Sequence, residues 1–203
     1  MSAQETTDND TARLEAFSDG VFAIAITLLV LEIRLPDSEG TLAHLIGGLW
    51  SSYLAYVLSF VTIGIMWANH HAVYRLIGRC THGLVVANLF LLMTISFLPF
   101  PTSVLADSLR EAGADQRTGA LFYSGTFIVI AIAFQALWQT AGRNNRLIVP
   151  GREAAADEIT RSYRLGIPMY TISLLVALWS PIASVILVGA IALYWLIPRG
   201  RAD

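Results

Sequence analysis

Residues Arg13 to Arg34 read RLEAFSDGVFAIAITLLVLEIR, a stretch in which long apolar runs surround a few polar side chains. As a helix, the segment from Leu14 to Leu35 would be about 33 Å long, enough to cross a bilayer core of about 30 Å. The segment nevertheless contains Ser18, Asp19 and Thr27. Ionisable and polar groups at membrane depth are costly and usually face a bundle interior or a water path. The pattern therefore predicts a membrane helix that lines an ion pore.

The rest of the chain has the composition of a polytopic membrane protein. Of its 203 residues, 55% are hydrophobic and only 14% are charged. The charges lie in short clusters between apolar runs of roughly twenty residues, the length of a membrane-spanning helix. A net charge of −2 and the absence of a basic block argue against a nucleic-acid partner. The single cysteine, Cys80, excludes an internal disulfide and gives no metal-binding motif.

The expected fold class is all-α, with six transmembrane helices per chain and both termini in the cytoplasm. One channel domain is expected over residues 13–198. Residues 1–12 are polar and acidic, with no basic segment before the first span, so we expect a disordered tail rather than a signal peptide. Residues 199–203 are expected to form a second tail. The six spans are expected at about 13–35, 45–74, 83–105, 118–140, 162–180 and 182–198.

The count of six depends on the last apolar segment, Leu165 to Ile197. A single helix of this length would measure about 50 Å, too long for one crossing without a large tilt. Ser180-Pro181 is a natural break, because proline cannot continue a helix from its amino-terminal side. A short juxtamembrane helix is also expected after Pro150-Gly151.

The distribution of arginine favours six spans over five. All 13 basic residues are arginine. With six spans and a cytoplasmic N-terminus, ten arginines lie inside and three (Arg34, Arg110 and Arg117) lie outside. An excess of arginine in cytoplasmic segments is the usual pattern, and a five-span count would move Arg199 and Arg201 outside.

Three aliphatic side chains of the first helix share one stripe. Ile24, Leu28 and Leu31 are spaced i, i+4 and i+7, with Gly20 one turn below and Thr27 beside them. From the stripe alone, ordinary helix packing is the preferred explanation of such spacing. The nearby Asp19 favours a pore without excluding a structural role.

Asp19 has four candidate partners near the cytoplasmic side, namely Arg13, Trp67, His70 and His71. One interpretation is a metal or proton site that the histidines form with Asp19. The two histidines are adjacent, however, so they point about 100° apart on a helix, unlike the i, i+4 pair of a zinc site. Structural hydrogen bonding is the simpler interpretation, and for Asn88 we expect an interhelical hydrogen bond.

The sequence contains no motif of a soluble enzyme and no potassium-channel filter. GxSxG, HExxH, a Walker loop and paired CxxC are all missing. There is also no TVGYG-like carbonyl filter and no acidic ring in mid-membrane. We therefore expect no enzymatic activity, no cofactor and no bound metal.

Three blocks resemble one known family of channels. RLEAFSDGVFAIAITLLVLEI resembles the first-helix signature of the bacterial relatives of the endolysosomal potassium channel, the transmembrane protein 175 family. GIMWANHHAVYRLI and NLFLLMTISFLPFPTSVL are similar to that family's next two blocks. The detailed resemblance covers about the first half of the chain.

This resemblance implies a potassium-permeable cation channel in the bacterial inner membrane, built as a homotetramer with a pore lined by four copies of the first helix. The family's aliphatic constriction falls on Ile24, with Leu28 and Leu31 as further layers, and its pore-facing hydroxyl falls on Thr27. A polar network near the inner mouth is implied too. Its expected members are Arg13, Ser18, Asp19, Trp67 and either His70 or His71.

Rings of isoleucine and leucine offer an ion no oxygen ligands, so such a constriction would act as a hydrophobic gate and sieve. Three other functions remain open on the residues themselves. The main alternative is a proton- or cation-coupled secondary transporter that uses Asp19 with His70 and His71. The others are an intramembrane enzyme with a His/Asp metal site and a structural membrane protein that transports nothing.

Overall fold

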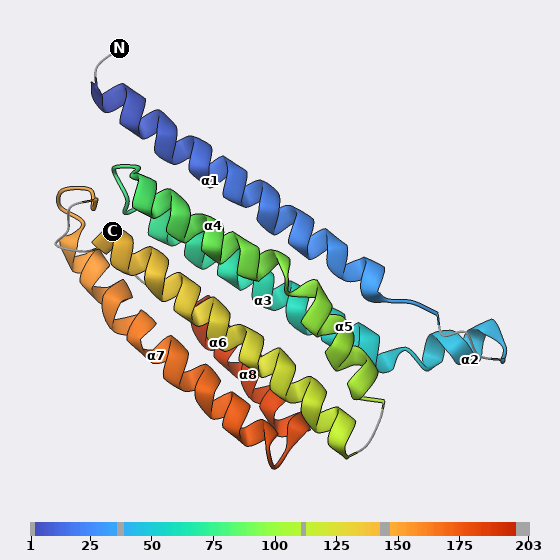
Figure 1. Ribbon diagram of the computed structural model, residues 1–203. Coiled ribbons are helices and arrows are strands. Elements are labelled where there is room, and N and C mark those ends of the chain that lie inside the picture. Colours follow the sequence, from blue (N-terminus) through green and yellow to red (C-terminus); the bar gives the residue numbers. More distant parts are fainter. Residues whose placement is uncertain (1–2, 36–38, 111–112, 143–146, 198–203) are drawn as a thin grey trace.

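The computed structural model describes residues 3–35, 39–110, 113–142 and 147–197, and for residues 3–9 only the backbone. Within these ranges the chain is built of helices (Figure 1). In chain order they are α1 (Ala3–Leu28), the 3-10 helix η1 (Leu29–Glu32), α2 (Leu42–Gly47), α3 (Trp50–Tyr74), α4 (His82–Ser96), α5 (Pro99–Ser108), α6 (Ala114–Gly142), α7 (Glu153–Ala177) and α8 (Pro181–Leu196).

The long helices run side by side along one direction, and α1 lies at one edge of the bundle (Figure 1). It packs against α3 and α4, which separate it from α6, α7 and α8. The α6–α7 contact is the most extensive in the fold. Only one lengthwise face of α1 is therefore covered by its own chain.

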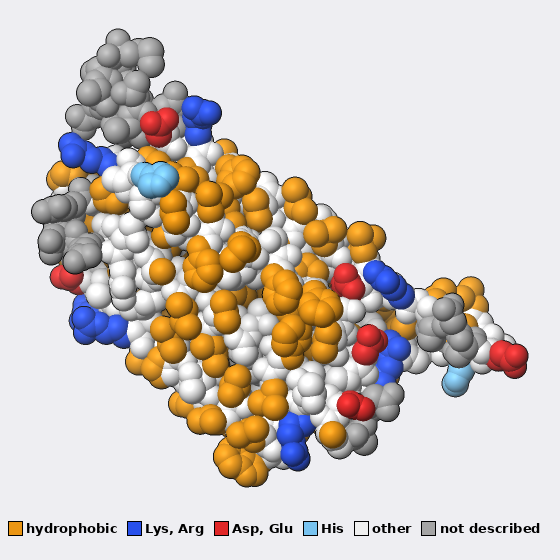
Figure 2. Space-filling model, in the orientation of Figure 1, with side chains coloured by type: hydrophobic (Ala, Val, Ile, Leu, Met, Phe, Trp, Pro, Cys, Tyr) orange, Lys and Arg blue, Asp and Glu red, His pale blue; other side chains and the backbone are white. Residues whose placement is uncertain are grey.

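Four helical segments are long and apolar enough to cross a membrane: Asp10–Glu32, Trp50–Tyr74, His82–Ser108 and Ala114–Gly142. Pro181–Leu196 is a shorter apolar helix, and α7 is not among the four. Figure 2 shows the corresponding surface pattern, a band of hydrophobic side chains with charged side chains towards the two ends of the helices. The structure thus has an all-helical membrane architecture.

The first helix begins earlier than expected. α1 starts at Ala3, so the helix includes most of the stretch predicted to be a disordered tail. That part of the chain contains no glycine or proline to stop the helix, and its polar composition was the only reason to expect disorder. The second predicted tail, residues 199–203, lies outside the described residues.

The third predicted span is divided in two. α4 ends at Ser96 and α5 begins at Pro99, inside the single apolar segment His82–Ser108 that corresponds to the span expected at 83–105. Pro99 lacks a backbone N–H and is tolerated in the first turn of a helix but not in its interior, so the chain starts a new helix there. Pro101 lies in the same first turn.

The last two helices follow the predicted break. α7 ends at Ala177, and α8 begins at Pro181 after the N-cap Ser180, whose side chain accepts a hydrogen bond from the Ala183 N–H. The short helix expected after Pro150-Gly151 is not separate, because it forms the first turns of α7.

Buried hydroxyl groups fasten the helices to one another inside the bundle. Ser59 of α3 lies 2.7 Å from the Thr102 hydroxyl and 2.9 Å from the Tyr123 hydroxyl, which joins α3, α5 and α6. The hydroxyl oxygens of Ser124 and Ser184 lie 2.8 Å apart and join α6 to α8. Hydrogen bonds between helices in an apolar environment stabilise the bundle. These bonds hold α3 to the other helices of the bundle, and α1 packs against α3.

Candidate functional site

The stripe predicted to line a pore lies on the uncovered face of α1 and η1. Ile24 is 59% exposed, Leu28 39% and Leu31 60%. Thr27 is also exposed, and its hydroxyl donates to the backbone oxygen of Ile24 at 2.9 Å. None of these three aliphatic side chains is buried within its own chain.

The opposite face of α1 is buried in the bundle. Phe22, Ala25 and Leu29 have at most 1% of their surface exposed. Since both faces are apolar, packing within one chain accounts for only one of them. The other face meets either lipid or another copy of the chain.

Phe17 belongs to the same uncovered stripe, although the sequence interpretation left it out. It precedes Ile24 by seven residues and is 54% exposed. Seven residues bring a helix back to nearly the same direction, so this spacing was the signal that could have identified it. The stripe therefore extends from Phe17 to Leu31.

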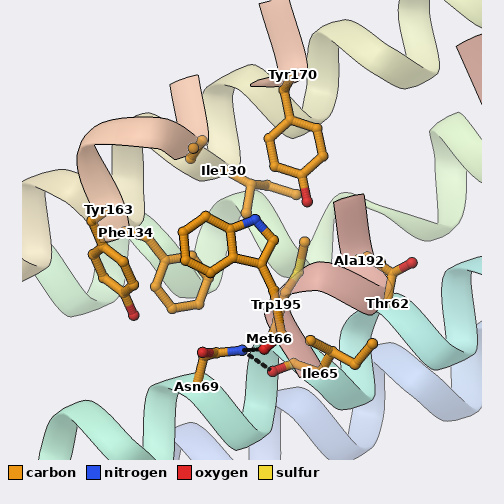
Figure 3. A pocket seen from close by; sticks show the side chains of 12 residues that line it. Thr62, Ile65, Met66, Asn69, Ile130, Phe134, Tyr163, Tyr170, Ala192 and Trp195 are labelled. Carbon is orange, nitrogen blue, oxygen red and sulfur yellow. Dashed lines mark hydrogen bonds between the residues drawn. The ribbon is translucent and has the colours of Figure 1, made fainter. Parts of the chain in front are cut away.

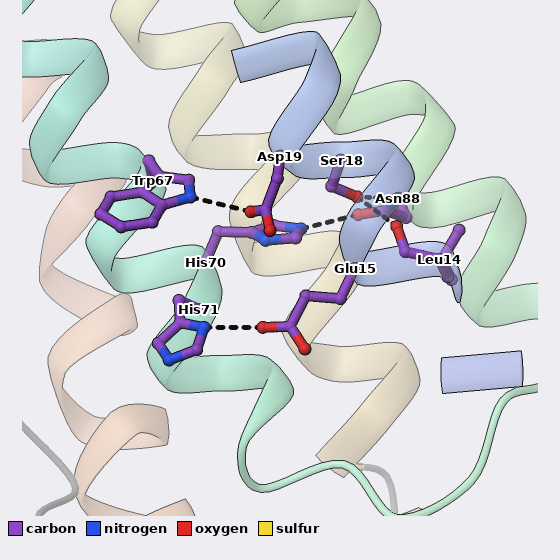
Figure 4. Close-up of polar contacts among 8 residues, drawn as sticks. All are labelled: Leu14, Glu15, Ser18, Asp19, Trp67, His70, His71 and Asn88. Atoms are coloured by element: carbon purple, nitrogen blue, oxygen red, sulfur yellow. Dashed lines mark hydrogen bonds and ion pairs between the residues drawn. The ribbon is translucent and has the colours of Figure 1, made fainter. Parts of the chain in front are cut away.

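Two parallel contacts join α1 to α3 near the Phe17 end of the stripe (Figure 4). The indole Nε1–H of Trp67 donates to Asp19 Oδ1 at 2.8 Å, and His71 Nδ1 lies 2.7 Å from Glu15 Oε1. Glu15 and Asp19 are four residues apart on α1, and Trp67 and His71 are four apart on α3. Each helix thus presents two polar groups on one face, one turn apart.

A second, buried chain of contacts joins α1 to α4 and α3. Asn88 Nδ2 donates to Ser18 Oγ at 2.9 Å, and Ser18 Oγ donates to the Leu14 backbone oxygen at 2.8 Å. Asn88 Oδ1 lies 2.9 Å from His70 Nε2. Because Asn88 Oδ1 can only accept, His70 Nε2 carries the proton of this bond. Ser18, His70 and Asn88 are completely buried.

The two adjacent histidines therefore have different surroundings. His70 points to Asn88 and stacks on Tyr74 with ring centroids 4.4 Å apart, whereas His71 is partly exposed and contacts Glu15. His70 Nδ1 and the Tyr74 hydroxyl are buried without a hydrogen-bond partner among the described residues. No group of three His, Cys, Asp or Glu side chains in the described part of the chain could hold a metal ion.

Comparison with known proteins identifies the family. Residues 13–99 match the family model described as the endosomal/lysosomal potassium channel TMEM175. A protein of Streptomyces collinus named a potassium channel is 44% identical over 190 residues, which cover 92% of each chain. The chain belongs to the TMEM175 family.

Other members of the TMEM175 family agree with this assignment. A protein of Chamaesiphon minutus named a potassium channel is 42% identical over 193 residues, covering 92% of this chain and 94% of the other. The crystal structure of a lysosomal potassium-selective channel TMEM175 homolog from the same organism superposes with a TM-score of 0.82 at 40% identity. It covers 92% of this chain and 96% of that one. The fold is thus that of a TMEM175 membrane channel, and the family's members are ion channels rather than enzymes.

Within this TMEM175 chain, the structure brings most of the predicted network together but leaves Arg13 apart. The contacts form three separate sets: Trp67 with Asp19, His71 with Glu15, and Ser18 with His70 through Asn88, which makes the interhelical hydrogen bond expected of it. Arg13 is exposed, and no described contact links it to them. It lines a hollow at the end of the bundle with Asp10, Phe17, Cys80 and His82. Glu15, by contrast, takes a place in the network that the sequence interpretation did not give it.

Proposed function

We propose that this chain forms a potassium-permeable channel in the bacterial cell membrane, with a pore lined by α1 from four copies of the chain. The observation that carries the proposal is the uncovered stripe of Ile24, Leu28 and Leu31. An aqueous path needs a wall on all sides, and one helix supplies only one side. The relatives named as potassium channels support potassium as the permeant ion.

In this proposal the stripe acts as gate and sieve. Ile24 forms the main constriction, Leu28 and Leu31 form further layers, and Thr27 supplies a pore-facing hydroxyl. A narrow aliphatic ring excludes water when closed and needs only a small movement of the lining helix to become wet. Potassium gives up its water more easily than sodium, so a filter-free apolar sieve favours potassium modestly.

The polar contacts below the stripe set the position of α1. Trp67 and His71 hold α1 against α3, and Asn88 holds it against α4. Because these contacts lie within about three turns of Ile24, a change in any of them moves the constriction. They form the inner-mouth network in the proposed channel, without Arg13.

The proposed topology has six spans, with α7 and α8 as the fifth and sixth and both termini in the cytoplasm. The arginine bias supports this orientation. It places the network of Asp19 and Trp67 at the cytoplasmic side and Leu31 at the outer side.

Reversal potentials in a planar bilayer test the channel. We expect potassium-selective currents from the wild type, a larger conductance or weaker selectivity in Ile24→Asn, and a changed potassium/sodium ratio in Thr27→Ala. Ile172→Asn is the matched control, because Ile172 is similarly exposed but lies on α7, which α3 and α4 separate from α1. Unchanged conductance and selectivity in both α1 variants would refute the pore assignment.

A proton- or cation-coupled transporter is the second candidate. It is favoured by the partly exposed Glu15–His71 pair, one turn from Asp19, which could pass a proton. A transporter would show saturable, pH-driven flux without unitary currents, so the same bilayer recordings separate the two functions.

A further inference from the structure

A cavity of about 60 Å³ lies inside the bundle, on the side of α3 that faces away from α1. Its walls come from α3, α6, α7 and α8 (Figure 3). Four aromatic side chains line it, namely Phe134, Tyr163, Tyr170 and Trp195. Asn69, Phe134 and Tyr163 are only partly buried, so the cavity is not sealed. It is separate from the stripe and the network described above.

One hydroxyl group that can donate a hydrogen bond borders the cavity. Tyr170 is only 6% exposed, and its hydroxyl points into the space beside Ile130 and Trp195 (Figure 3). No hydrogen-bond partner for this hydroxyl is found among the described residues. Because the hydroxyl faces the space of the cavity, it can donate to an occupant that carries an acceptor oxygen.

The other polar groups of the wall are engaged but retain free lone pairs. Thr62 Oγ1 donates to the Leu58 backbone oxygen at 2.7 Å and can still accept. Asn69 Nδ2 lies within 3.0 Å of the backbone oxygens of Ile65 and Trp195, which holds the end of α8 against α3. The wall carries no carboxylate, guanidinium or imidazole group. A charged ligand would have no partner there, and burying a charge without one is costly.

We propose that this cavity is a binding site for a small neutral alcohol. The Tyr170 hydroxyl donates to the oxygen of the alcohol, the hydroxyl of the alcohol donates to Thr62 Oγ1, and its carbon atoms contact the aromatic rings. The size agrees with this class, because one water molecule needs about 10–15 Å³ of such space, so 60 Å³ holds several water molecules or one short-chain alcohol.

The site is placed to act on α1 through α3. Met66 and Asn69 line the cavity, whereas their neighbours Trp67 and His70 contact α1 and α4. A molecule bound behind α3 therefore presses on the helix that holds α1. An effect on current rests on the proposed channel function, but binding itself does not.

Quenching of tryptophan fluorescence by 2-bromoethanol tests the site in the full-length protein in nanodiscs, because bromine quenches a nearby indole such as Trp195. We expect saturable quenching above a linear background. Ala192→Leu should abolish the saturable part by filling the cavity. Ala190→Leu is the matched control, since Ala190 is exposed on the same helix and should leave quenching unchanged.

Tyr170→Phe keeps the shape of the cavity and removes only the donor. It should weaken 2-bromoethanol binding about fivefold, the effect of one neutral hydrogen bond, and leave binding of bromoethane, which has no oxygen, unchanged. Purely linear quenching in the wild type would show that the cavity holds only water and would overturn the proposal. Equal effects of Tyr170→Phe on both probes would overturn the proposed recognition.

Discussion

The indole nitrogen of Trp67 lies 2.8 Å from a carboxylate oxygen of Asp19, which ties the C-terminal third of α3 to α1 five residues before Ile24. The contact is charge-assisted, and such hydrogen bonds are stronger than neutral ones. The more exposed Glu15–His71 contact lies one turn away and joins the same two helices.

Loss of the Trp67 donor should loosen α1. Trp67→Phe retains the ring packing but leaves Asp19 without this hydrogen bond, and we expect the free energy of unfolding to fall by about 1 kcal/mol, because the pair is partly exposed. Chemical unfolding in detergent measures the change. Trp50→Phe is the control, since Trp50 is similarly exposed on α3. Equal losses in the two variants would mean that the Asp19 contact contributes nothing.

Substitution of Asn88 should lower the free energy of unfolding more than substitution of Trp67. Asn88→Leu removes the acceptor of His70 and the donor to Ser18, both in a completely buried site. The variant leaves His70 Nε2 without a partner and removes one of the two hydrogen bonds of Ser18, which together should cost about 3 kcal/mol. Thr94→Val on the same helix should cost less than about 1 kcal/mol, because the Thr94 hydroxyl bonds only to its own helix, at the Leu91 oxygen. A similar cost for both variants contradicts the role given to Asn88.

The Glu15–His71 contact should contribute little to stability. The His71 side chain is 51% exposed and that of Glu15 is 23% exposed. Exposed ion pairs contribute about 0–1 kcal/mol, so His71→Gln should change the free energy of unfolding by less than about 1 kcal/mol. Unfolding curves of wild type and variant decide this, and a loss as large as that expected for Asn88→Leu would show that the contact is a main attachment of α1.

Cys80 reports the orientation of the chain. It is the only cysteine and lies between α3 and α4, on the side proposed to be cytoplasmic. Burial raises the pKa of its thiol, and the charge of Asp10 raises it further. Since the thiolate is the reactive form, alkylation at pH 7 should be slow and should accelerate as the pH rises towards the raised pKa.

A membrane-impermeant maleimide applied to inverted and right-side-out vesicles measures this labelling. We expect reaction only in inverted vesicles, where the cytoplasmic side is exposed. Labelling confined to right-side-out vesicles would reverse the proposed topology.

Much of this arrangement could be predicted from local sequence. The spacing of Ile24, Leu28 and Leu31 gave one stripe of α1, because helical periodicity is a local property. Pro181 likewise indicated the start of α8. Pro99 likewise begins a helix, α5. Because Pro99 lies near the far end of an apolar run, it was interpreted as the end of one helix and not as a break between two.

The partners of the polar residues could not be predicted in the same way. Trp67, His70 and His71 were all candidates for Asp19, and the choice depends on the rotation of α3 against α1, which many dispersed packing contacts determine together. The early start of α1 at Ala3 was missed because polar composition suggested disorder where no residue interrupts the helix.

Cadmium block of cysteine variants tests the central claim most directly. In a Cys80→Ala background, Ile24→Cys should place several thiols around one axis, and cadmium should then block the potassium current at micromolar concentration. Ile26→Cys, on the face of α1 packed against the core, should be insensitive. Block of Ile24→Cys alone is the predicted result, whereas an equal response of the two variants, or no response of Ile24→Cys, would contradict a pore lined by α1.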